Sequence, residues 1–178
     1  MTYGLWKACH EARACEHLPP APPADNQDYP VTRINAQDIE EFSRWLNAEN
    51  NAGWRLPSLT EWRELSAELP KRKTKKLFTD PRLAWAADYD LSPPQPRTVQ
   101  PSGAFGALAN GLRDMGGNVF EWTGTCVMPD PGRFICPAYF VTGAHEAGIP
   151  IFLRDPATGG CAAGTPPANL GFRLVREL

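Results

Sequence analysis

The segment Leu112–Trp122, LRDMGGNVFEW, places two carboxylates, Asp114 and Glu121, on either side of the pair Gly116–Gly117. Glycine readily adopts positive φ values, so the backbone can turn here and direct carbonyl oxygens toward one another. Two carboxylates and converging carbonyls are the ligands that a hard cation such as Ca²⁺ requires. The same residues also fit a tight turn in which Glu121 forms a buried ion pair with an arginine. The segment alone does not decide between these interpretations.

Cysteines form a second set of side chains that can do chemistry, at Cys9, Cys15, Cys126, Cys136 and Cys161. Two close pairs can be drawn, Cys9 with Cys15 and Cys126 with Cys136, and two local disulfides would suit a periplasmic or secreted protein. A helix that contains Cys9 would then end before Cys15, because an i,i+6 pair on one helix diverges too far. The alternative is five reduced cysteines acting as small apolar residues in a cytoplasmic protein. The opening residues MTYGLWKACHEAR lack the layout of a signal peptide, which weighs against export.

Three further sequence features give weaker information about function. The segment CHEARACEH offers Cys9, His10, Cys15 and His17 as zinc ligands, but their spacing matches no common zinc finger, so disulfide or core roles are favoured. The basic run at Lys71–Lys76 has no interleaved aromatic residues, and the net charge is −2, so we expect a solvated loop and no nucleic-acid partner. No apolar run approaches the roughly 20 residues that a membrane-spanning helix needs.

The elements that position these residues are expected to be mixed. Helices are predicted at Tyr3–Arg13, at Ala36–Asn47 and from Leu59 to about Leu69. Asn35 with Asp38, and Ser58 with Glu61, are placed to cap the second and third helices. Short strands are predicted at 31–34 and, between turns, at 83–89, 119–122, 134–141, 150–153 and 171–175. Helices followed by short irregular strands indicate an α+β fold in one domain, 1–178.

Several large or charged residues are predicted to be structural. The arginines Arg55 and Arg173 are expected to be buried, and each then needs a carboxylate, for which Glu61 and Glu121 are candidates without an assigned pairing. Five tryptophans are expected to be core residues before they are binding residues, namely Trp45, Trp54, Trp62, Trp85 and Trp122.

Four segments between Pro30 and the C-terminal residue resemble, in order and rough spacing, the formylglycine-generating-enzyme (sulfatase-modifying factor) superfamily. They are YPVTRINAQDIEEFSRWLN, WRLPSLTEWREL, NGLRDMGGNVFEWTGTC and NLGFRLVREL. The opening segment YGLWKACHEARACE also resembles bacterial members, including NirV-like accessory proteins of nitrite reductase. The resemblance implies a C-type-lectin-like core with little regular secondary structure, here without the strand that usually begins the family domain.

The resemblance also assigns site residues. The family's structural calcium site maps onto Asp114, Gly117, Val119 and Glu121, and a loop cysteine pair of bacterial relatives maps onto Cys126 and Cys136. Active members bind copper through two cysteines before the NLGFR segment, where this chain has only Cys161, so copper is not expected. The iron-dependent sulfoxide synthases of the superfamily need a histidine cluster, and His10, His17 and His145 do not form its pattern.

These assignments favour a non-catalytic scaffold that binds a ligand or a protein partner through the loops of 140–167. One alternative is a formylglycine-generating or related metal-dependent oxidase that acts on a protein cysteine and uses Cys161. Another is a maturation or accessory factor for a periplasmic metalloenzyme, which rests on analogy with the NirV-like proteins.

Overall fold

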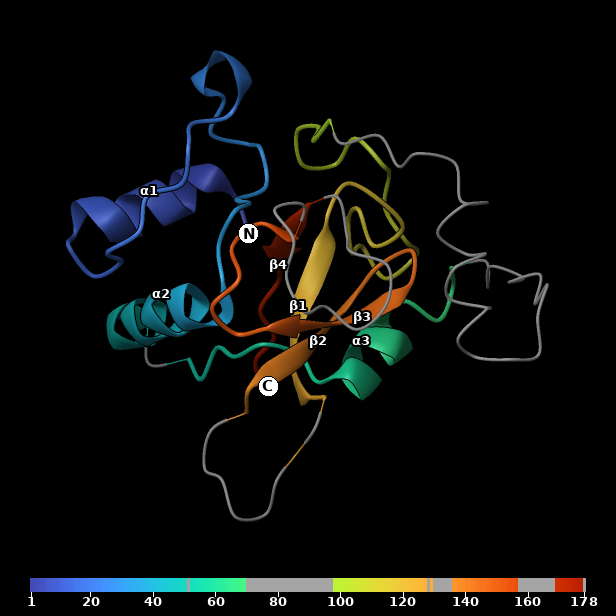
Figure 1. Ribbon diagram of the computed structural model, residues 1–178. Coiled ribbons are helices and arrows are strands. Elements are labelled where there is room, and N and C mark those ends of the chain that lie inside the picture. The colour runs from blue at the N-terminus through green and yellow to red at the C-terminus, as the bar shows by residue number, and fades with distance from the viewer. Residues whose placement is uncertain (51, 70–97, 128, 130–135, 157–168, 178) are drawn as a thin grey trace.

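A computed structural model describes residues 1–50, 52–69, 98–127, 129, 136–156 and 169–177 (Figure 1). Helical elements come first along the chain and strands follow, so the predicted α+β layout is confirmed. The helical elements are α1 (Tyr3–Glu11), the short 3₁₀ element η1 (Pro23–Asp25), α2 (Ala36–Asn50) and α3 (Leu59–Leu65). The strands are β1 (Phe120–Cys126), β2 (Ala138–Thr142), β3 (Glu146–Pro150) and β4 (Leu170–Phe172). No helix in these ranges combines the length and apolar character that a membrane crossing needs.

The four strands form one mixed sheet in the order β3-β2-β1-β4. β2 pairs antiparallel with both β1 and β3, whereas β4 pairs parallel with β1 and sets Glu121 opposite Gly171. In Figure 1, α1 and α2 lie together on one side of the sheet and α3 lies close to β1. β1 therefore runs through the centre of the molecule, and the residues that follow β4 are brought beside it.

An aromatic cluster joins the helices to the sheet. The rings of Trp6 and Phe42 are stacked with centroids 5.3 Å apart, and Phe172 from β4 meets both rings edge-on. All three side chains are fully buried, as is Trp122 of β1. Burial of such large apolar surfaces is the main stabilising contribution of a core, so α1, α2 and the end of the chain pack as one unit.

Both predicted helix caps are present. Asn35 Oδ1 accepts from the Asp38 N–H at 2.9 Å, and Asp38 Oδ2 accepts from the Asn35 N–H at 2.9 Å. Ser58 Oγ accepts from the Glu61 N–H at 3.1 Å, and Glu61 Oε2 accepts from the Ser58 N–H at 2.7 Å. Each box satisfies N–H groups that have no partner within the helix, which fixes where α2 and α3 begin.

Two helices are shorter than predicted. α1 ends at Glu11, and the chain then turns through Arg13 at φ +60°, with the Ala14 and Cys15 N–H groups both donating to the Cys9 carbonyl. This turn brings Cys15 back to Cys9, as the sequence required for a disulfide. α3 ends at Leu65 and continues only as a turn to residue 69.

Two strand predictions are wrong. Residues 31–34 form no strand because Arg33 has φ +57°, although Val31 and Ile34 are fully buried. The strand predicted at 150–153 shares only Pro150 with β3, and the chain then turns, with the Leu153 N–H donating to the Pro150 carbonyl at 3.1 Å. The predictions for 83–89, Trp85, Lys71–Lys76 and Cys161 lie outside the described residues.

Candidate functional site

Glu121 of β1 forms a buried ion pair with an arginine, which was one of the two interpretations of the segment Leu112–Trp122. Arg173 donates from Nε to Oε2 at 2.6 Å and from Nη2 to Oε1 at 2.7 Å. Trp62 of α3 donates from its indole nitrogen to Oε2 at 2.6 Å. Glu121 is only 6% exposed, and a buried carboxylate of this kind needs such partners to remain charged. The parallel pairing of β4 with β1 explains why Arg173 is the arginine that reaches it.

Arg55 pairs with the other candidate carboxylate, Glu61, through two hydrogen bonds of 2.7 and 2.8 Å. The prediction that Arg55 is buried is wrong, because its side chain is 44% exposed beside the surface start of α3. The hydrogen bonds from Arg55, followed by those from Ser58, lower the pKa of Glu61 to about 2. This pair therefore supports a helix cap at the surface.

The tryptophans divide into two groups. Trp62 and Trp122 are buried, as predicted, whereas Trp45 and Trp54 are only half-buried. Asn47 holds the backbone of Trp54 through bonds to its N–H and its carbonyl at 2.6 and 2.9 Å. The two half-buried rings line the grooves described below.

Gly116 and Gly117 do not adopt the positive φ values that the sequence suggested. Positive φ values occur at Asp114 (+58°) and Asn118 (+72°), on either side of the pair, and not at Gly116 or Gly117. Gly117 is needed for space, because a Cβ there would lie 2.5 Å from the Phe105 ring, whereas a Cβ on Gly116 would lie 3.1 Å from a Leu69 methyl group, which a small shift could relieve. Two side chains from distant segments thus pack directly on this turn.

Asp114 organises the loop that carries Phe105. Its Oδ2 accepts from the Gly103 N–H at 2.6 Å, and its Oδ1 accepts from the Phe105 N–H at 2.9 Å. Asn118 binds the backbone of Gln100 through both its amide oxygen and its amide nitrogen, each at 2.9 Å. The residues flanking the glycine pair therefore fix the path of the loop that precedes it.

Three of the four predicted calcium ligands, Asp114, Gly117 and Glu121, already have protein partners. Both carboxylates accept the bonds given above, and the Gly117 carbonyl accepts from the Val119 N–H at 3.0 Å. Among the described residues, no group of three or more histidine, cysteine or acidic side chains is arranged to hold a metal ion. A carboxylate oxygen keeps a second lone pair when it accepts one bond, so calcium at Asp114, Gly117, Val119 and Glu121 stays a prediction.

Both predicted disulfides are present. Cys9 bonds Cys15 with Cα atoms 5.4 Å apart, and Cys126 bonds Cys136 with Cα atoms 5.7 Å apart. The zinc interpretation of CHEARACEH is not favoured by this arrangement, because a disulfide provides no thiolate ligand. His10 Nδ1 lies 2.9 Å from the Cys15 carbonyl, and His17 Nε2 lies 3.0 Å from the Arg33 carbonyl.

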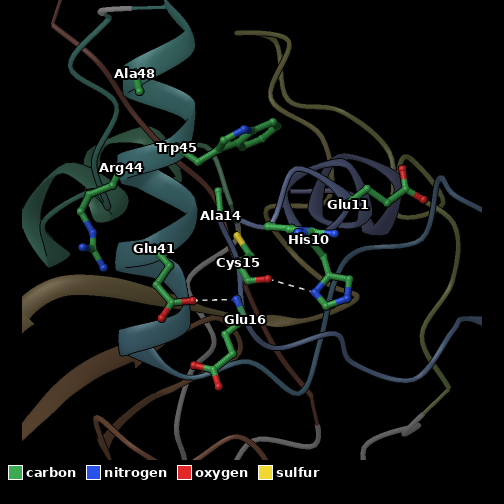
Figure 2. A pocket seen from close by; sticks show the side chains of 10 residues that line it. His10, Glu11, Ala14, Cys15, Glu16, Glu41, Arg44, Trp45 and Ala48 are labelled. Atoms are coloured by element: carbon green, nitrogen blue, oxygen red, sulfur yellow. Dashed lines mark hydrogen bonds between the residues drawn. The ribbon is translucent and has the colours of Figure 1, made fainter.

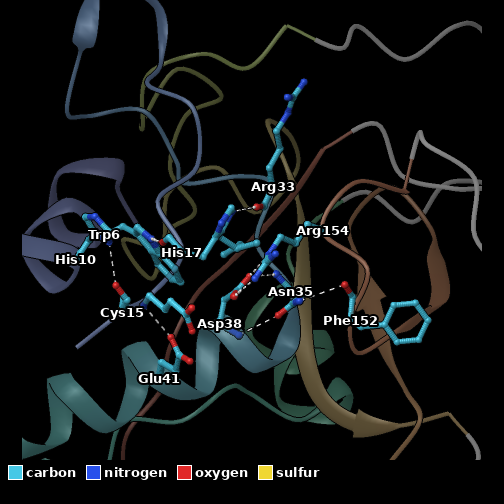
Figure 3. Close-up of polar contacts among 12 residues, drawn as sticks. Trp6, His10, Cys15, His17, Arg33, Asn35, Asp38, Glu41, Phe152 and Arg154 are labelled. Atoms are coloured by element: carbon cyan, nitrogen blue, oxygen red, sulfur yellow. Dashed lines mark hydrogen bonds and ion pairs between the residues drawn. The ribbon is translucent and has the colours of Figure 1, made fainter. Parts of the chain in front are cut away.

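A polar network at the start of α2 holds the turn after β3 (Figure 3). Asp38 is 5% exposed, and Arg154 donates to both of its oxygens at 2.8 Å. Asn35 Nδ2 donates to the Phe152 carbonyl at 3.2 Å. The bonds to Asp38 raise the pKa of Arg154, and the charges of Glu16 and Glu41 act in the same direction. The sequence indicated Asp38 only as a cap and carried no signal for Arg154.

Phe152 stands out on this turn because its side chain is 68% exposed while its backbone is fixed. The Ala36 N–H donates to the Ile151 carbonyl at 3.1 Å, so the neighbouring residue is also tied to α2. Phe152 lies within the predicted partner surface of 140–167, of which the structure describes 140–156. An exposed aromatic ring on an anchored turn is a typical contact residue.

Two grooves flank α2. The disulfide groove, with a volume of about 980 Å³, lies between α2 and the end of α1 with its disulfide loop (Figure 2). It is lined by His10, Glu11, Arg13, Ala14, Cys15, Glu16, Glu41, Arg44, Trp45 and Ala48. The Trp54 groove, of about 560 Å³, lies on the other side of α2 and is lined mainly by α2, residues 54–58 and Gly124 of β1. Arg44 lines both grooves.

A comparison of the sequence with models of known protein families assigns this chain to a family. The sulfatase-modifying factor enzyme 1-like domain matches residues 7–178. The chain belongs to this family. Two solved structures share the fold of this sulfatase-modifying-factor domain. PvdO from Pseudomonas aeruginosa matches with a TM-score of 0.51 and 21% identity over 86% of this chain and 64% of that chain. CarF matches with a TM-score of 0.56 and 20% identity over 99% of this chain and 82% of that chain.

Two curated relatives are also similar to the sulfatase-modifying-factor domain. The hercynine oxygenase of Mycolicibacterium smegmatis (strain ATCC 700084 / mc(2)155) is 32% identical over 110 residues. The hercynine oxygenase of Mycobacterium tuberculosis (strain ATCC 25618 / H37Rv) is 30% identical over 112 residues. The matched region is 59% of this chain and 24% of each relative, so the chain spans about a quarter of the length of these relatives.

The donor set of this sulfatase-modifying-factor domain does not fit the copper site of active members. That site needs two soft thiolates, and four of the five cysteines are joined in disulfides. Cys161 is the cysteine that remains. Within these 178 residues, a second thiolate would require reduction of Cys9–Cys15 or Cys126–Cys136. The ring of His145 packs edge-on against Phe120 at a centroid distance of 4.7 Å.

Proposed function

We propose that this sulfatase-modifying-factor domain is a binding or accessory module that recognises a protein or peptide and does not itself carry the family's copper chemistry. The observation that carries the proposal is the pairing of four of the five cysteines, which leaves Cys161 without a second thiol for a copper(I) site. The capped helices and the disulfides form a rigid frame, and function on such frames commonly resides in the exposed loops.

The proposed contact surface is the segment 140–167, and Phe152 is its most exposed large apolar side chain among the described residues. Because the Ile151 carbonyl is bonded to the Ala36 N–H and the Phe152 carbonyl to Asn35 Nδ2, docking of the Phe152 ring would require little ordering. Two oxidised cysteine pairs also support a periplasmic or secreted location. Such a location fits the version of the proposal in which the domain is a NirV-like accessory factor for a metalloenzyme.

Two measurements test the proposal on the protein with both disulfides intact. The first is a Cu(I) titration against a colorimetric chelator, combined with oxygen uptake in the presence of a cysteine-containing peptide. We expect neither a stoichiometric copper site nor peptide-dependent oxygen uptake. One copper per chain that is lost in Cys161→Ser, together with oxygen uptake, would overturn the proposal.

The second measurement is affinity capture from the native source, with calcium and with chelator. We expect a protein that is retained by the wild type and by Leu18→Ser but lost with Phe152→Ser. Leu18 is a matched control because it is a large apolar side chain that is 41% exposed and lies in a different part of the chain. Failure to capture any protein under all of these conditions would count against a binding module.

A metal-dependent oxidase remains the second candidate, including one that converts a protein cysteine to formylglycine. The similarity to two hercynine oxygenases favours it. The metal ligands would then have to come from residues outside those that the structure describes or from a further segment or partner. Copper binding and oxygen uptake in the first measurement are the results that would favour this candidate.

A further inference from the structure

The two disulfides of this domain lie in different surroundings. Cys9 and Cys15 are at most 1% exposed and belong to the hydrophobic core. Cys126 and Cys136 are both half-buried, at the end of β1 and shortly before β2. Thiol–disulfide exchange begins when a thiolate attacks one sulfur of the bond, so its rate depends on access. A reductant in solution therefore reaches Cys126–Cys136 more readily than Cys9–Cys15.

The Cys9–Cys15 disulfide is also surrounded by hydrogen bonds that hold its two residues together. The Ala14 and Cys15 N–H groups donate to the Cys9 carbonyl at 3.1 and 3.3 Å. The His10 Nδ1 atom lies 2.9 Å from the Cys15 carbonyl. For a reductant to reach either sulfur, the end of α1 would have to leave the core, so this disulfide is structural.

The Cys126–Cys136 disulfide lies where the sheet is irregular. The pairing of β1 with β2 shifts its register between Trp122 and Cys126, and such a shift disrupts the hydrogen-bond ladder locally. Beyond the shift, the Val127 N–H donates to the Ala138 carbonyl at 2.9 Å. The other end of β1 pairs with both β2 and β4. Opening this disulfide would thus loosen one end of the sheet and leave its centre in place.

One hydrogen bond connects this end of the sheet to the turn that carries Phe152. Pro137 directly follows Cys136, and its carbonyl accepts from the Ile151 N–H at 3.1 Å. Ile151 in turn precedes Phe152, the exposed aromatic residue of the proposed contact surface. Folded proteins open locally in contiguous units, beginning where contacts are fewest. Release of Cys136 would therefore weaken the bond that holds the Ile151 N–H.

We propose that the Cys126–Cys136 disulfide is a redox-sensitive site, which a dithiol reductant opens while the rest of the fold stays intact, and that its opening loosens the Phe152 turn. Reduction breaks one S–S bond, and two electrons and two protons pass from the dithiol to the two cysteines. The dithiol becomes a disulfide in the same exchange. The redox-sensitive site does not depend on the proposed function, whereas an effect on partner binding at Phe152 would rest on it.

The first test compares the reduction rates of the two disulfides in the folded protein. A Cys161→Ser variant is used, so that no fifth thiol exchanges with either pair. Dithiothreitol reduces the protein in native buffer, iodoacetamide blocks the freed thiols, and mass spectrometry of the peptides quantifies each modified cysteine. We expect Cys126 and Cys136 to be modified at least about tenfold faster than Cys9 and Cys15. Equal rates, or faster modification of Cys9 and Cys15, would overturn the proposal.

Reduction in urea is the control for access. Once the chain is unfolded, we expect the two disulfides to be reduced at rates within about threefold of each other, because neither is then buried. A tenfold difference that persists in urea would arise from the local sequence and not from the fold, which contradicts the argument. If Cys126–Cys136 is reduced only at urea concentrations that unfold the domain, it opens by global unfolding and is not a separate site.

The second test measures whether opening this disulfide changes the structure around it. Amide hydrogen exchange is compared between the oxidised protein and a variant with both Cys126→Ser and Cys136→Ser, which imitates the reduced form. We expect the Val127 and Ile151 amides to exchange at least about tenfold faster in the variant, because their hydrogen bonds lie next to the missing crosslink. Unchanged exchange at both amides would show that the disulfide does not control the Phe152 turn.

The Phe120 amide is the matched control, because it donates to the Asn169 carbonyl at 2.9 Å at the other end of β1. We expect its exchange rate to change by less than about twofold. A similar increase at Phe120 and at Ile151 would mean that the variant is destabilised as a whole, and the proposal of a local opening would fail.

Failure of this inference is distinguishable from failure of the proposed function. Neither test uses a partner, so negative results in both would leave the copper and capture measurements to decide the proposed function. If both tests succeed and Phe152→Ser has no effect on capture, the redox-sensitive site stands and the proposed contact surface is wrong.

Discussion

Replacing Glu121 by glutamine would remove one negative charge from a buried site and keep nearly the same volume. The side chains of Arg173 and Glu121 are 16% and 8% exposed, so the guanidinium that remains would have little access to water. Removing one partner of a buried ion pair costs about 3–5 kcal/mol. We take about 3 kcal/mol, because glutamine can still accept the bond from Trp62 and Arg173 retains some exposure. In a domain of this size, that loss lowers Tm by roughly 6–12 °C.

The control is Glu146→Gln. Glu146 and Arg63 form a similar bidentate pair, with hydrogen bonds of 2.7 and 2.8 Å. Their side chains are 37% and 56% exposed, so the expected loss is only about 0.2–1 kcal/mol. The two pairs have similar geometry and differ in burial, which isolates the effect of desolvation.

Urea denaturation of both variants, with the disulfides intact, measures the free energy of unfolding. An Arg173→Met variant and its combination with Glu121→Gln complete a double-mutant cycle, in which the coupling energy should account for most of the loss. If Glu121→Gln destabilises the domain no more than Glu146→Gln does, the argument that Glu121 holds the scaffold through a buried charge pair is refuted.

Three further predictions concern other contacts. Asp38→Asn should keep the α2 cap but weaken the contact with Arg154, lowering stability by about 1–2 kcal/mol in thermal melts; no change in Tm would contradict a role for that contact. The folded-state pKa of Glu61, about 2, lies below its ordinary value of 4.5, so its stabilising pair with Arg55 should be complete above about pH 4.5 and be lost as the pH falls toward 2. Glu61→Gln should flatten that part of the pH–stability curve, and an unchanged curve would show that other groups cause it. If calcium binds at Asp114, saturating calcium at 100 times Kd should add about 2.7 kcal/mol of stability, and Asp114→Asn should abolish the gain; identical melts in calcium and in chelator would remove the calcium assignment.

The features that could be predicted from the sequence depend on neighbours along the chain. The Ser58–Glu61 box involves residues three positions apart, so its residue types are sufficient to place the start of α3. The Cys9–Cys15 pair is also local, and the turn it needs follows directly from the geometry of a helix.

The features that could not be predicted depend on contacts that no local sequence pattern indicates, most of them between segments far apart in the chain. The need for glycine at position 117 comes from Phe105, whose ring lies where a Cβ would be, and nothing near Gly117 in the sequence indicates that contact. Arg173 is the partner of Glu121 because β4 pairs parallel with β1, and a three-residue strand carries too little pattern to predict its register. Arg154 reaches Asp38 for a similar reason, since the two are 116 residues apart.

The edge-on contact of Phe172 with Trp6 also sets an order in which parts of the core can form. The two rings are 172 − 6 = 166 residues apart, so a ribosome that adds about 5–20 residues per second makes Trp6 roughly 8–33 s before its partner exists. Cys9 and Cys15 emerge together during that interval, and their turn needs no later residue to form. The turn that places Cys15 beside Cys9 is therefore available early, and its disulfide forms once the chain reaches an oxidising compartment. Closure of the aromatic cluster awaits the synthesis of Phe172, and contacts of such long range make folding slow. During this interval the N-terminal helix exposes an apolar face, and a chaperone that shields it would raise the yield of folded protein.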